Sequence, residues 1–388
     1  MRNVSLKLAA MMGCLLMLAG CWDVKTIQDI NYTTAVGLDY EEGQYIVYVQ
    51  LLDFANVAKQ EGGGKPTQQS PVFVGRGEGI TLGAAFNEVT KAAQQQMFWG
   101  HVSAVVIGEG LLKRGLKKED FDSMIRFREI RFSQWIYGTR QPITNIFNKN
   151  SFFNLSPLST ILHHPEMNYA QNSTIRPLRF QTFVSLLQEP GKMVLLPSIG
   201  ITSESWIEDR KPQPMLYNDG VFAINKEGSA AFFEADSMMG VRWTETKTMR
   251  ITLTVSGDGR PIGSLVCKNP DSVFKTKMEG ETPTFTVSGS VDCRINELIK
   301  EGEPDLIKQM AEKEIRRQVE SSYKSGKEKG RDVLGLEHVL YRQDFESWSK
   351  LTDNGKRPLP NYTLKSVQFK VDLIHSGMYR EERTEDNY

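Results

Sequence analysis

The sequence predicts a multi-domain protein of mixed α/β and α+β class, with about three domains. The chain has 388 residues, more than one compact hydrophobic core usually holds. Strand-like and helix-like segments alternate from residue 71 to 147, which is typical of an α/β layer. Two helical patterns and an alternating strand close the chain, which predicts a C-terminal domain of antiparallel sheet plus helices.

These patterns divide the chain into five parts. The expected parts are a removed signal peptide at 1–20, an N-terminal α/β domain at 21–197, a middle hairpin-containing domain at 198–250, a C-terminal α+β domain at 251–380 and a disordered tail at 381–388.

The elements expected in the N-terminal domain begin with a hairpin. Residues 33–52 carry two β-branched and aromatic runs around an acid-Gly turn, and the second run is apolar on both faces, as in a strand buried on both sides. The expectations that follow are an exposed flexible loop at 58–71, strands at 71–74, 101–108 and 132–138, helices at 80–95, 119–128, 143–147 and 180–188, and irregular chain at 150–180.

The later elements are expected to form a second hairpin and then the C-terminal domain. The hairpin covers 218–233 and turns at Asn225–Gly228. Strands are expected at 248–256, 284–295 and 362–377, and helices at 305–324 and 333–348, while 257–283 is rich in Gly, Pro and charge. Alternating apolar residues make the last strand half-exposed, so its sheet is expected to be one-sided.

The start of the chain has the features of an export signal. Arg2 and Lys7 precede an apolar run at 8–20, which would rise about 20 Å as a helix and is too short for a hydrocarbon core of about 30 Å. A basic region, a short apolar region and small residues before a boundary are typical of a signal peptide.

The boundary itself, Leu18-Ala19-Gly20-Cys21, resembles the bacterial lipobox. The resemblance implies that Cys21 becomes the first residue, an N-palmitoyl and S-diacylglycerol cysteine that anchors the protein in membrane lipid. One acyl chain holds a protein only marginally at a bilayer, whereas two give a lasting anchor. The alternative is an ordinary signal peptide with a cysteine that happens to lie near the cleavage point.

Composition narrows the function classes. Lys+Arg and Asp+Glu number 47 each, and loss of Arg2 and Lys7 would leave a net charge of −2, so no basic face for nucleic acid is expected. No later stretch approaches 18 apolar residues, which predicts a soluble body on a lipid tether. Cys267 and Cys293 remain after Cys14 and Cys21, and either a disulfide or two buried free thiols would fit.

The sequence contains no convincing catalytic or metal constellation. VGRGEGITLG at 74–83 has glycines between a strand and a helix, but Ile80 occupies the third place of a dinucleotide fingerprint, so a tight turn before Thr81 is expected instead. The five histidines lack zinc spacing, and His163-His164-Pro165-Glu166 is interpreted as a chance surface cluster. We therefore expect no catalytic residues, no cofactor and no metal.

Interaction surfaces are the remaining possibility. Exposed aromatic residues would mark an interface, although core packing explains most of them equally well. The residues considered are Trp22, Trp99, Trp243 and Trp348. The polar side of the long C-terminal helix, with Glu312, Arg316, Glu320 and Lys324 at i, i+4 spacing, is interpreted as a solvated face.

An ordered set of segments resembles the Ger(x)C lipoproteins, the C subunits of spore germinant receptors. The segments are Cys21-Trp22-Asp23, AVGLD at 35–39, GITLGAAF at 79–86, FWGH at 98–101, VVIGE at 105–109, Gly115-Leu116, IRFREIR at 125–131, DGVFA at 219–223, DVLGL at 332–336 with Trp348, and the terminal strand. Two places depart from the family pattern. Phe127 replaces the usual Asp, and Val241-Arg242-Trp243 stands where the family more often has a Leu-rich segment.

The resemblance implies a non-enzymatic subunit of a nutrient-sensing complex in spore germination. Its implied partners are the integral-membrane A and B subunits, and its implied location is the extracytoplasmic, cortex-facing side of the spore inner membrane. The resemblance implies a fold of three α/β-type domains. Cys21 is the one residue of this chain to which the resemblance assigns a functional role. An extracytoplasmic solute-binding lipoprotein that delivers a nutrient to a transporter is the alternative, and it would have two similar lobes around a hinge.

Overall fold

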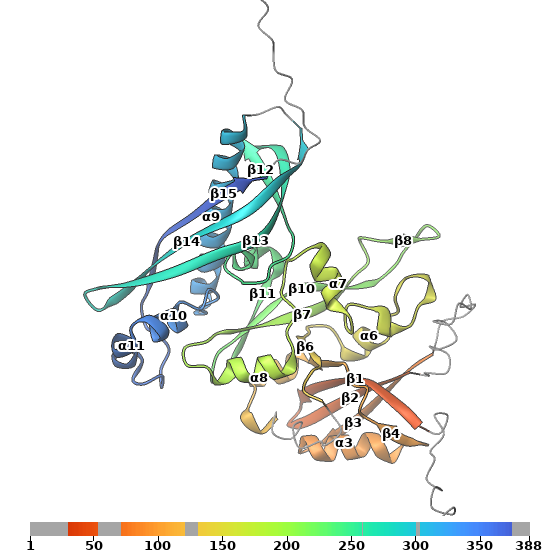
Figure 1. Ribbon diagram of the computed structural model, residues 1–388. Helices are drawn as coiled ribbons and strands as arrows, with labels where there is room; N and C mark the ends of the chain where they lie inside the picture. Colours follow the sequence, from red (N-terminus) through yellow and green to blue (C-terminus); the bar gives the residue numbers. More distant parts are fainter. Residues whose placement is uncertain (1–29, 53–70, 121–130, 258, 300–302, 375–388) are drawn as a thin grey trace, which may run out of the picture.

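The computed structural model describes residues 30–52, 71–120, 131–257, 259–299 and 303–374. It confirms a mixed α and β fold. Figure 1 shows the red to yellow N-terminal elements on one side, the cyan and blue C-terminal elements on the other, and green strands between them. The predicted loop at 58–71, except Pro71, and the predicted tail at 381–388 lie outside the described residues.

The described N-terminal part is built on a nine-stranded mixed sheet with the order β11-β10-β7-β6-β5-β1-β2-β3, in which β4 also pairs with β1. Its strands are β1 (Ile30–Glu41), β2 (Gln44–Leu52), β3 (Val72–Gly79), β4 (Gln96–Phe98), β5 (Ala104–Ile107), β6 (Trp135–Gly138), β7 (Val194–Thr202), β10 (Met215–Ile224) and β11 (Ala230–Glu234). Strand β1 pairs parallel to β5, β5 to β6 and β6 to β7, as is typical of an α/β layer.

Both faces of this sheet are covered by helices. The helices are α3 (Leu82–Lys91), α4 (Glu109–Arg114), α6 (Ile143–Phe147), α7 (Pro165–Gln171) and α8 (Phe180–Gln188). Ile46 and Val47 of β2 are both buried, so the prediction of a strand covered on two sides is confirmed. The helices predicted near 143–147 and 180–188 are present, whereas the one predicted at 119–128 lies mostly outside the described residues.

Most of the glycine-rich stretch after residue 74 is a strand, and the turn expected before Thr81 is limited to a bend at Ile80 and Thr81. Strand β3 runs to Gly79 and pairs with β2 along its whole length. Helix α3 packs directly on its glycines, because a Cβ on Gly77 would lie 2.3 Å from the carbonyl oxygen of Ala85. The glycines serve close packing of helix on strand. Thr81 caps α3 as expected, accepting a hydrogen bond from the Ala84 N–H at 3.2 Å.

The second hairpin, β10–β11, forms as predicted and extends the same nine-stranded sheet. The predicted boundary between 197 and 198 falls inside β7. The division into three domains therefore stays a prediction, since the sheet continues across that boundary. Two short strands, β8 (Ile207–Glu208) and β9 (Lys211–Pro212), form a separate small hairpin before β10.

The described C-terminal part has a four-stranded sheet with the order β12-β13-β14-β15. Its strands are β12 (Ile251–Gly257), β13 (Arg260–Glu279), β14 (Thr282–Leu298) and β15 (Thr363–Leu373). Strand β13 occupies the stretch in which no strand was expected. The first three strands are antiparallel as predicted, but β15 pairs parallel to β14, because the helices between them provide the crossover that parallel pairing needs.

The C-terminal helices are α9 (Pro304–Glu328), α10 (Leu336–Gln343) and α11 (Phe345–Thr352). Helix α9 buries Ile307, Ala311, Ile315 and Val319 at the predicted spacing. Its polar side is not simply solvated, because Arg316 donates to the Val367 carbonyl and Glu312 accepts from the Val371 N–H. The helix thus supplies partners to backbone groups of the edge strand β15.

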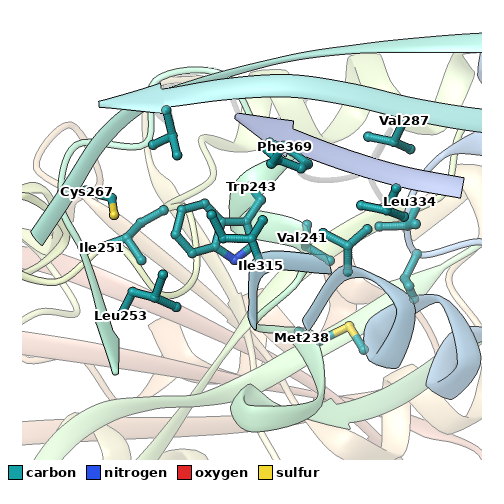
Figure 2. Packing of buried hydrophobic residues seen from close by; sticks show 14 of the residues in the cluster. Met238, Val241, Trp243, Ile251, Leu253, Cys267, Val287, Ile315, Leu334 and Phe369 are labelled. Atoms are coloured by element: carbon teal, nitrogen blue, oxygen red, sulfur yellow. The ribbon is translucent and has the colours of Figure 1, made fainter. Parts of the chain in front are cut away.

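One continuous core joins the two parts. Val221 and Phe233 of the second hairpin belong to the same buried cluster as Ile315 of α9 and Phe369 of β15. The segment after the hairpin contains two 3₁₀ turns, η4 (Ala235–Met238) and η5 (Val241–Trp243), and Figure 2 shows Trp243 in the middle of this cluster. The Trp243 indole donates to Gln318 of α9 at 2.9 Å, which fixes the segment on the helix.

Candidate functional site

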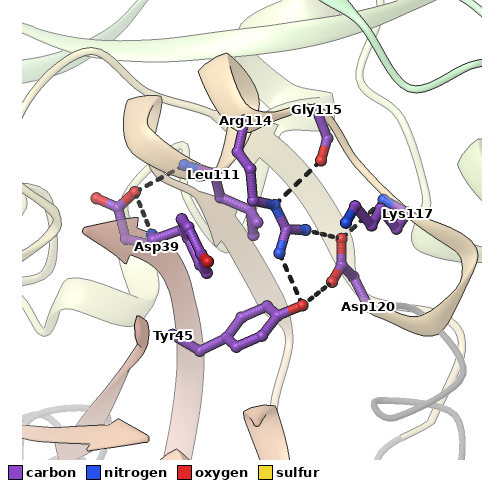
Figure 3. A network of polar contacts seen from close by, with 8 residues as sticks. Asp39, Tyr45, Leu111, Arg114, Gly115, Lys117 and Asp120 are labelled. Carbon is purple, nitrogen blue, oxygen red and sulfur yellow. Dashed lines mark hydrogen bonds and ion pairs between the residues drawn. The ribbon is translucent and has the colours of Figure 1, made fainter. Parts of the chain in front are cut away.

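A network of polar contacts lies where β1, β2 and α4 meet (Figure 3). Arg114 donates to the Tyr45 hydroxyl at 2.7 Å and forms an ion pair with Asp120, which is almost fully buried. The Tyr45 hydroxyl in turn donates to Asp120 at 2.7 Å, and the Lys117 N–H donates to the same carboxylate. Each charged side chain in this network is paired, so the network has a structural role: it links β2, α4 and the chain that follows α4.

The same joint contains Asp39 at the end of β1. Its carboxylate accepts hydrogen bonds from the Tyr40 N–H at 2.9 Å and the Leu111 N–H at 3.0 Å, and so caps the start of α4. Burial raises the pKa of Asp39, while these backbone hydrogen bonds lower it. A Cβ on Gly108 would lie 2.3 Å from that carboxylate, so the close approach requires glycine. AVGLD and VVIGE are thereby brought together as a structural joint.

A second network is buried around His163. Gln50 Nε2 donates to the Phe147 carbonyl at 2.7 Å, which turns Gln50 Oε1 toward Thr34 and His163. That oxygen only accepts, so His163 Nε2 carries the hydrogen, and Nδ1 accepts from the Ser103 hydroxyl at 2.6 Å. Burial lowers the pKa of His163 to about 3, with a smaller contribution from His164, so the ring is neutral.

The Ser103–His163 pair resembles a nucleophile and its base only in distance. His163 is 2% exposed and both of its ring nitrogens are hydrogen-bonded. A base needs access to the proton that it removes. The pair therefore serves packing between β2, the start of β5 and the chain before α7. No sequence signal separated His163 from a surface histidine.

The interpretation of His163-His164-Pro165-Glu166 as a surface cluster is wrong for His163 and Pro165, which are both buried. His164 and Glu166 are exposed, and Glu166 pairs with Arg179 at 2.9 Å. The described part of the chain contains no group of three or more His, Cys, Asp or Glu side chains placed to hold a metal ion.

The cysteines that the sequence left open form a disulfide. Cys267 of β13 and Cys293 of β14 are directly opposite in the antiparallel register, and their sulfurs are bonded. Cys21 lies outside the described residues, so its acylation stays a prediction. Within the described residues, every helix is too short or too polar to span a bilayer.

The tryptophans considered for an interface are core residues. Trp99, Trp243 and Trp348 are each at most 4% exposed, and Trp22 lies outside the described residues. Of the two explanations that the sequence left open, core packing therefore holds for Trp99, Trp243 and Trp348.

An exposed aromatic cluster lies elsewhere, on η2 (Phe152–Asn154) and the β8–β9 hairpin. Phe153 is 84% exposed, Trp206 53% and Ile207 74%, and the rings of Phe152 and Trp206 meet edge to face at 4.7 Å. We call Phe152, Phe153, Trp206 and Ile207 the aromatic projection; β8 extends away from the body in Figure 1. Trp206 stands among polar residues, in SESWIEDRK, and that local pattern could have indicated exposure.

Known proteins match almost the whole chain. Residues 23–201 match the family model "Spore germination protein N-terminal domain", and residues 219–377 match "Spore germination B3/ GerAC like, C-terminal". The chain belongs to the Ger(x)C family of spore germination proteins. The resemblance found in the sequence is therefore confirmed.

Individual Ger(x)C relatives agree with this assignment. "Spore germination protein KC" of Bacillus subtilis (strain 168) is 22% identical over 382 residues, covering 94% of this chain and 93% of the relative. "Spore germination protein B3" of the same organism is 22% identical over 287 residues, covering 73% of this chain and 72% of the relative.

A solved structure, "Crystal Structure of the GerBC protein", matches with a TM-score of 0.54 and 17% identity. The match covers 87% of this chain and 96% of that chain. It shows that the Ger(x)C chain described above shares its fold with that protein.

Proposed function

We propose that this Ger(x)C protein is a lipid-anchored, non-enzymatic subunit of a nutrient germinant receptor. It acts by contact with integral-membrane A and B subunits on the extracytoplasmic face of the spore inner membrane. The match of both family models across residues 23–201 and 219–377 is the observation that carries the proposal.

The tether favours action at a bilayer. The chain from Cys21 to Ile30, where β1 begins, reaches about 30 Å when fully extended. Acylation of Cys21 would therefore keep the N-terminal sheet close to the membrane surface. Confinement of this kind raises the effective concentration of a membrane partner without any new contact.

The paired charges of the site favour a structural role for its polar residues. Asp120 is bound to Arg114 and Tyr45, and His163 is enclosed by Gln50 and Ser103. The aromatic projection has the composition of a binding surface, because Trp is enriched among the few residues that contribute most of the binding energy of an interface. We assign it to contact with an integral-membrane receptor subunit.

The test replaces the chromosomal gene by variants and follows nutrient-triggered germination together with membrane fractionation. Cys21→Ala removes the acylated thiol and is expected to release the protein from the membrane and to slow germination. Cys14→Ala is the matched control, because it removes a thiol of similar sequence context within the expected signal. A Cys21→Ala protein that stays membrane-bound, in spores that germinate normally, would refute the anchor.

Deletion of the gene tests the receptor role separately. Normal germination of the deletion strain, in a background without a redundant receptor, would remove the receptor assignment. The solute-binding alternative expects two similar lobes, and the described sheets differ in strand number and order. That arrangement does not favour the alternative.

A further inference from the structure

A large cavity lies between the nine-stranded sheet and the C-terminal domain. Its volume is about 640 Å³, which is in the range of small-molecule sites. Its walls come from strands β6, β7 and β10 of the nine-stranded sheet, from the chain around α7 and α8, from η4 and η5, and from the chain leading into α10. Phe274 of β13 adds a wall from the four-stranded sheet. Figure 2 labels three of its lining residues, Met238 and Val241 on the η4–η5 segment and Leu334 before α10.

The lining combines apolar side chains with an excess of cations. Its apolar surface includes Ile175, Leu186, Met193, Val221, Met238 and Val339. Four lining residues are Arg or Lys, and Glu245 is the one acidic residue in the lining. Glu245 is already paired with Arg176 at 3.2 Å. Arg179 is likewise paired with Glu166 at 2.9 Å. Lys192 and Arg242 are therefore the lining cations left for an anion.

Arg242 is the buried member of this set. Its side chain is 6% exposed, and its guanidinium donates to Gln318 Oε1 at 3.2 Å. Among the residues that the structure describes, Arg242 forms no ion pair and its Nε has no hydrogen-bond partner. The carboxylate that acts on its charge is Glu314 of α9, which is itself paired with Arg317 at 2.6 Å. A buried cation without a direct ion pair is costly, so a cation held this way is typical of a binding position.

Lys192 lies on the same cavity. It is half-buried, and its Nζ lies near Gly335, at the turn into α10. In the described part of the chain Lys192 has no ion-pair partner within 4.0 Å. Both cations line the same cavity, and a carboxylate is a group that either of them can bind, while the apolar walls leave room for a hydrocarbon body.

We propose that this cavity binds a small organic carboxylate with an apolar body, with Arg242 as the principal partner of the carboxylate. A ligand there contacts both sheets at once, so its binding would stabilise one arrangement of the two. The inference gives the proposed receptor subunit a ligand class, but it is tested on the isolated protein, where failure to bind leaves the germination experiments untouched.

The experiment uses the full mature chain in detergent micelles, labelled with ¹³C at the methionine methyl groups. Met193 and Met238 line the cavity, whereas Met215 and Met249 do not, which gives reporters and internal controls in one spectrum. The probes are 4-methylpentanoate and 3-phenylpropionate, each compared with its neutral amide. We expect saturable shifts of Met193 and Met238 with the carboxylates and about tenfold weaker binding of the amides.

Two variants locate the carboxylate. Arg242→Gln is expected to weaken binding of the carboxylates about tenfold and to leave the amides unchanged, and Lys192→Gln to weaken it less. Arg210→Gln, at an exposed arginine outside the cavity, is the control. No shift with carboxylate at about 10 mM, or equal affinity for acid and amide in the unmodified protein, would overturn the proposal whether or not the Arg242 variant folds.

Discussion

Neutral His163 makes the stability of this protein dependent on pH in a predictable direction. The ring is 2% exposed, and burial lowers its pKa from 6.5 to about 3. Below pH 6.5 the unfolded chain therefore binds a proton that the folded chain excludes. Stability from this residue is fully present above that pH and is lost as the pH falls toward 3.

The size of the effect follows from the two pKa values. One pKa unit corresponds to about 1.4 kcal/mol, so between pH 8 and pH 5 the His163 contribution should fall by about 2 kcal/mol. His163→Gln removes the titration and retains an amide that can donate to Gln50. The variant is expected to be less stable at pH 8 because the fit to Ser103 is lost, and to recover about 2 kcal/mol relative to wild type by pH 5.

The assay is urea unfolding of wild type, His163→Gln and His164→Gln at several pH values. His164 is the matched control because it is the adjacent histidine and is exposed. Its variant should follow the wild-type pH profile closely. If His163→Gln and wild type lose stability in parallel between pH 8 and pH 5, the neutral, buried state assigned to His163 is wrong.

Three further outcomes are expected. Gly77→Ala places a Cβ 2.3 Å from a backbone oxygen of α3, so in urea unfolding it should destabilise the protein by about 1–3 kcal/mol. Gly83→Ala, at a helix position with open space around it, should stabilise the protein by up to about 1 kcal/mol. Equal effects of the two substitutions would contradict the close packing of α3 on β3. Burial raises the pKa of Asp332 to about 6, so its folded carboxyl keeps a proton that the unfolded one loses. The contribution of Asp332 to stability should therefore fall as the pH rises from 3.8 to about 6, and Asp332→Asn should gain up to about 3 kcal/mol over wild type through this range. A stability difference that does not change with pH would be the contrary result. Trp206→Ala should reduce co-purification of the protein with the membrane subunits without changing its stability. Phe73→Ala, at a residue that is also exposed but lies outside the aromatic projection, should leave co-purification unchanged. Equal co-purification of the two variants would show that the aromatic projection is not the contact surface.

The local sequence pattern predicted most helices and strands, because residues close together in the chain determine their type. The β1–β2 hairpin has its turn chemistry and apolar runs in adjacent residues, and α9 repeats its apolar side chains at four-residue steps. Strand β13 was missed because Asn269 and Pro270 interrupt its pattern. The register shifts between Lys268 and Asp271, and a bulge of this kind tolerates a proline that a regular ladder excludes.

The candidate sites depended on contacts between distant segments. His163 and Gln50 meet although 113 residues separate them, and neither has a local pattern that names the other. The sequence left Trp243 as a possible interface residue, whereas in the structure α9 covers it. The neighbouring Arg242, on the same 3₁₀ turn, lines the cavity. Exposure of a side chain depends on what packs over it, which one strand or turn does not specify.

The sequence by itself determined the family, the expected anchor at Cys21 and the type of most helices and strands, because these depend on residues close together in the chain. Only the tertiary structure decided that glycines of β3 lie under α3, that β15 runs parallel to β14, and that an unpaired arginine faces a cavity between two sheets. The physical reason is that burial, close approach and charge pairing are properties of neighbours in space, and folding chooses those neighbours by packing both sheets into shared cores.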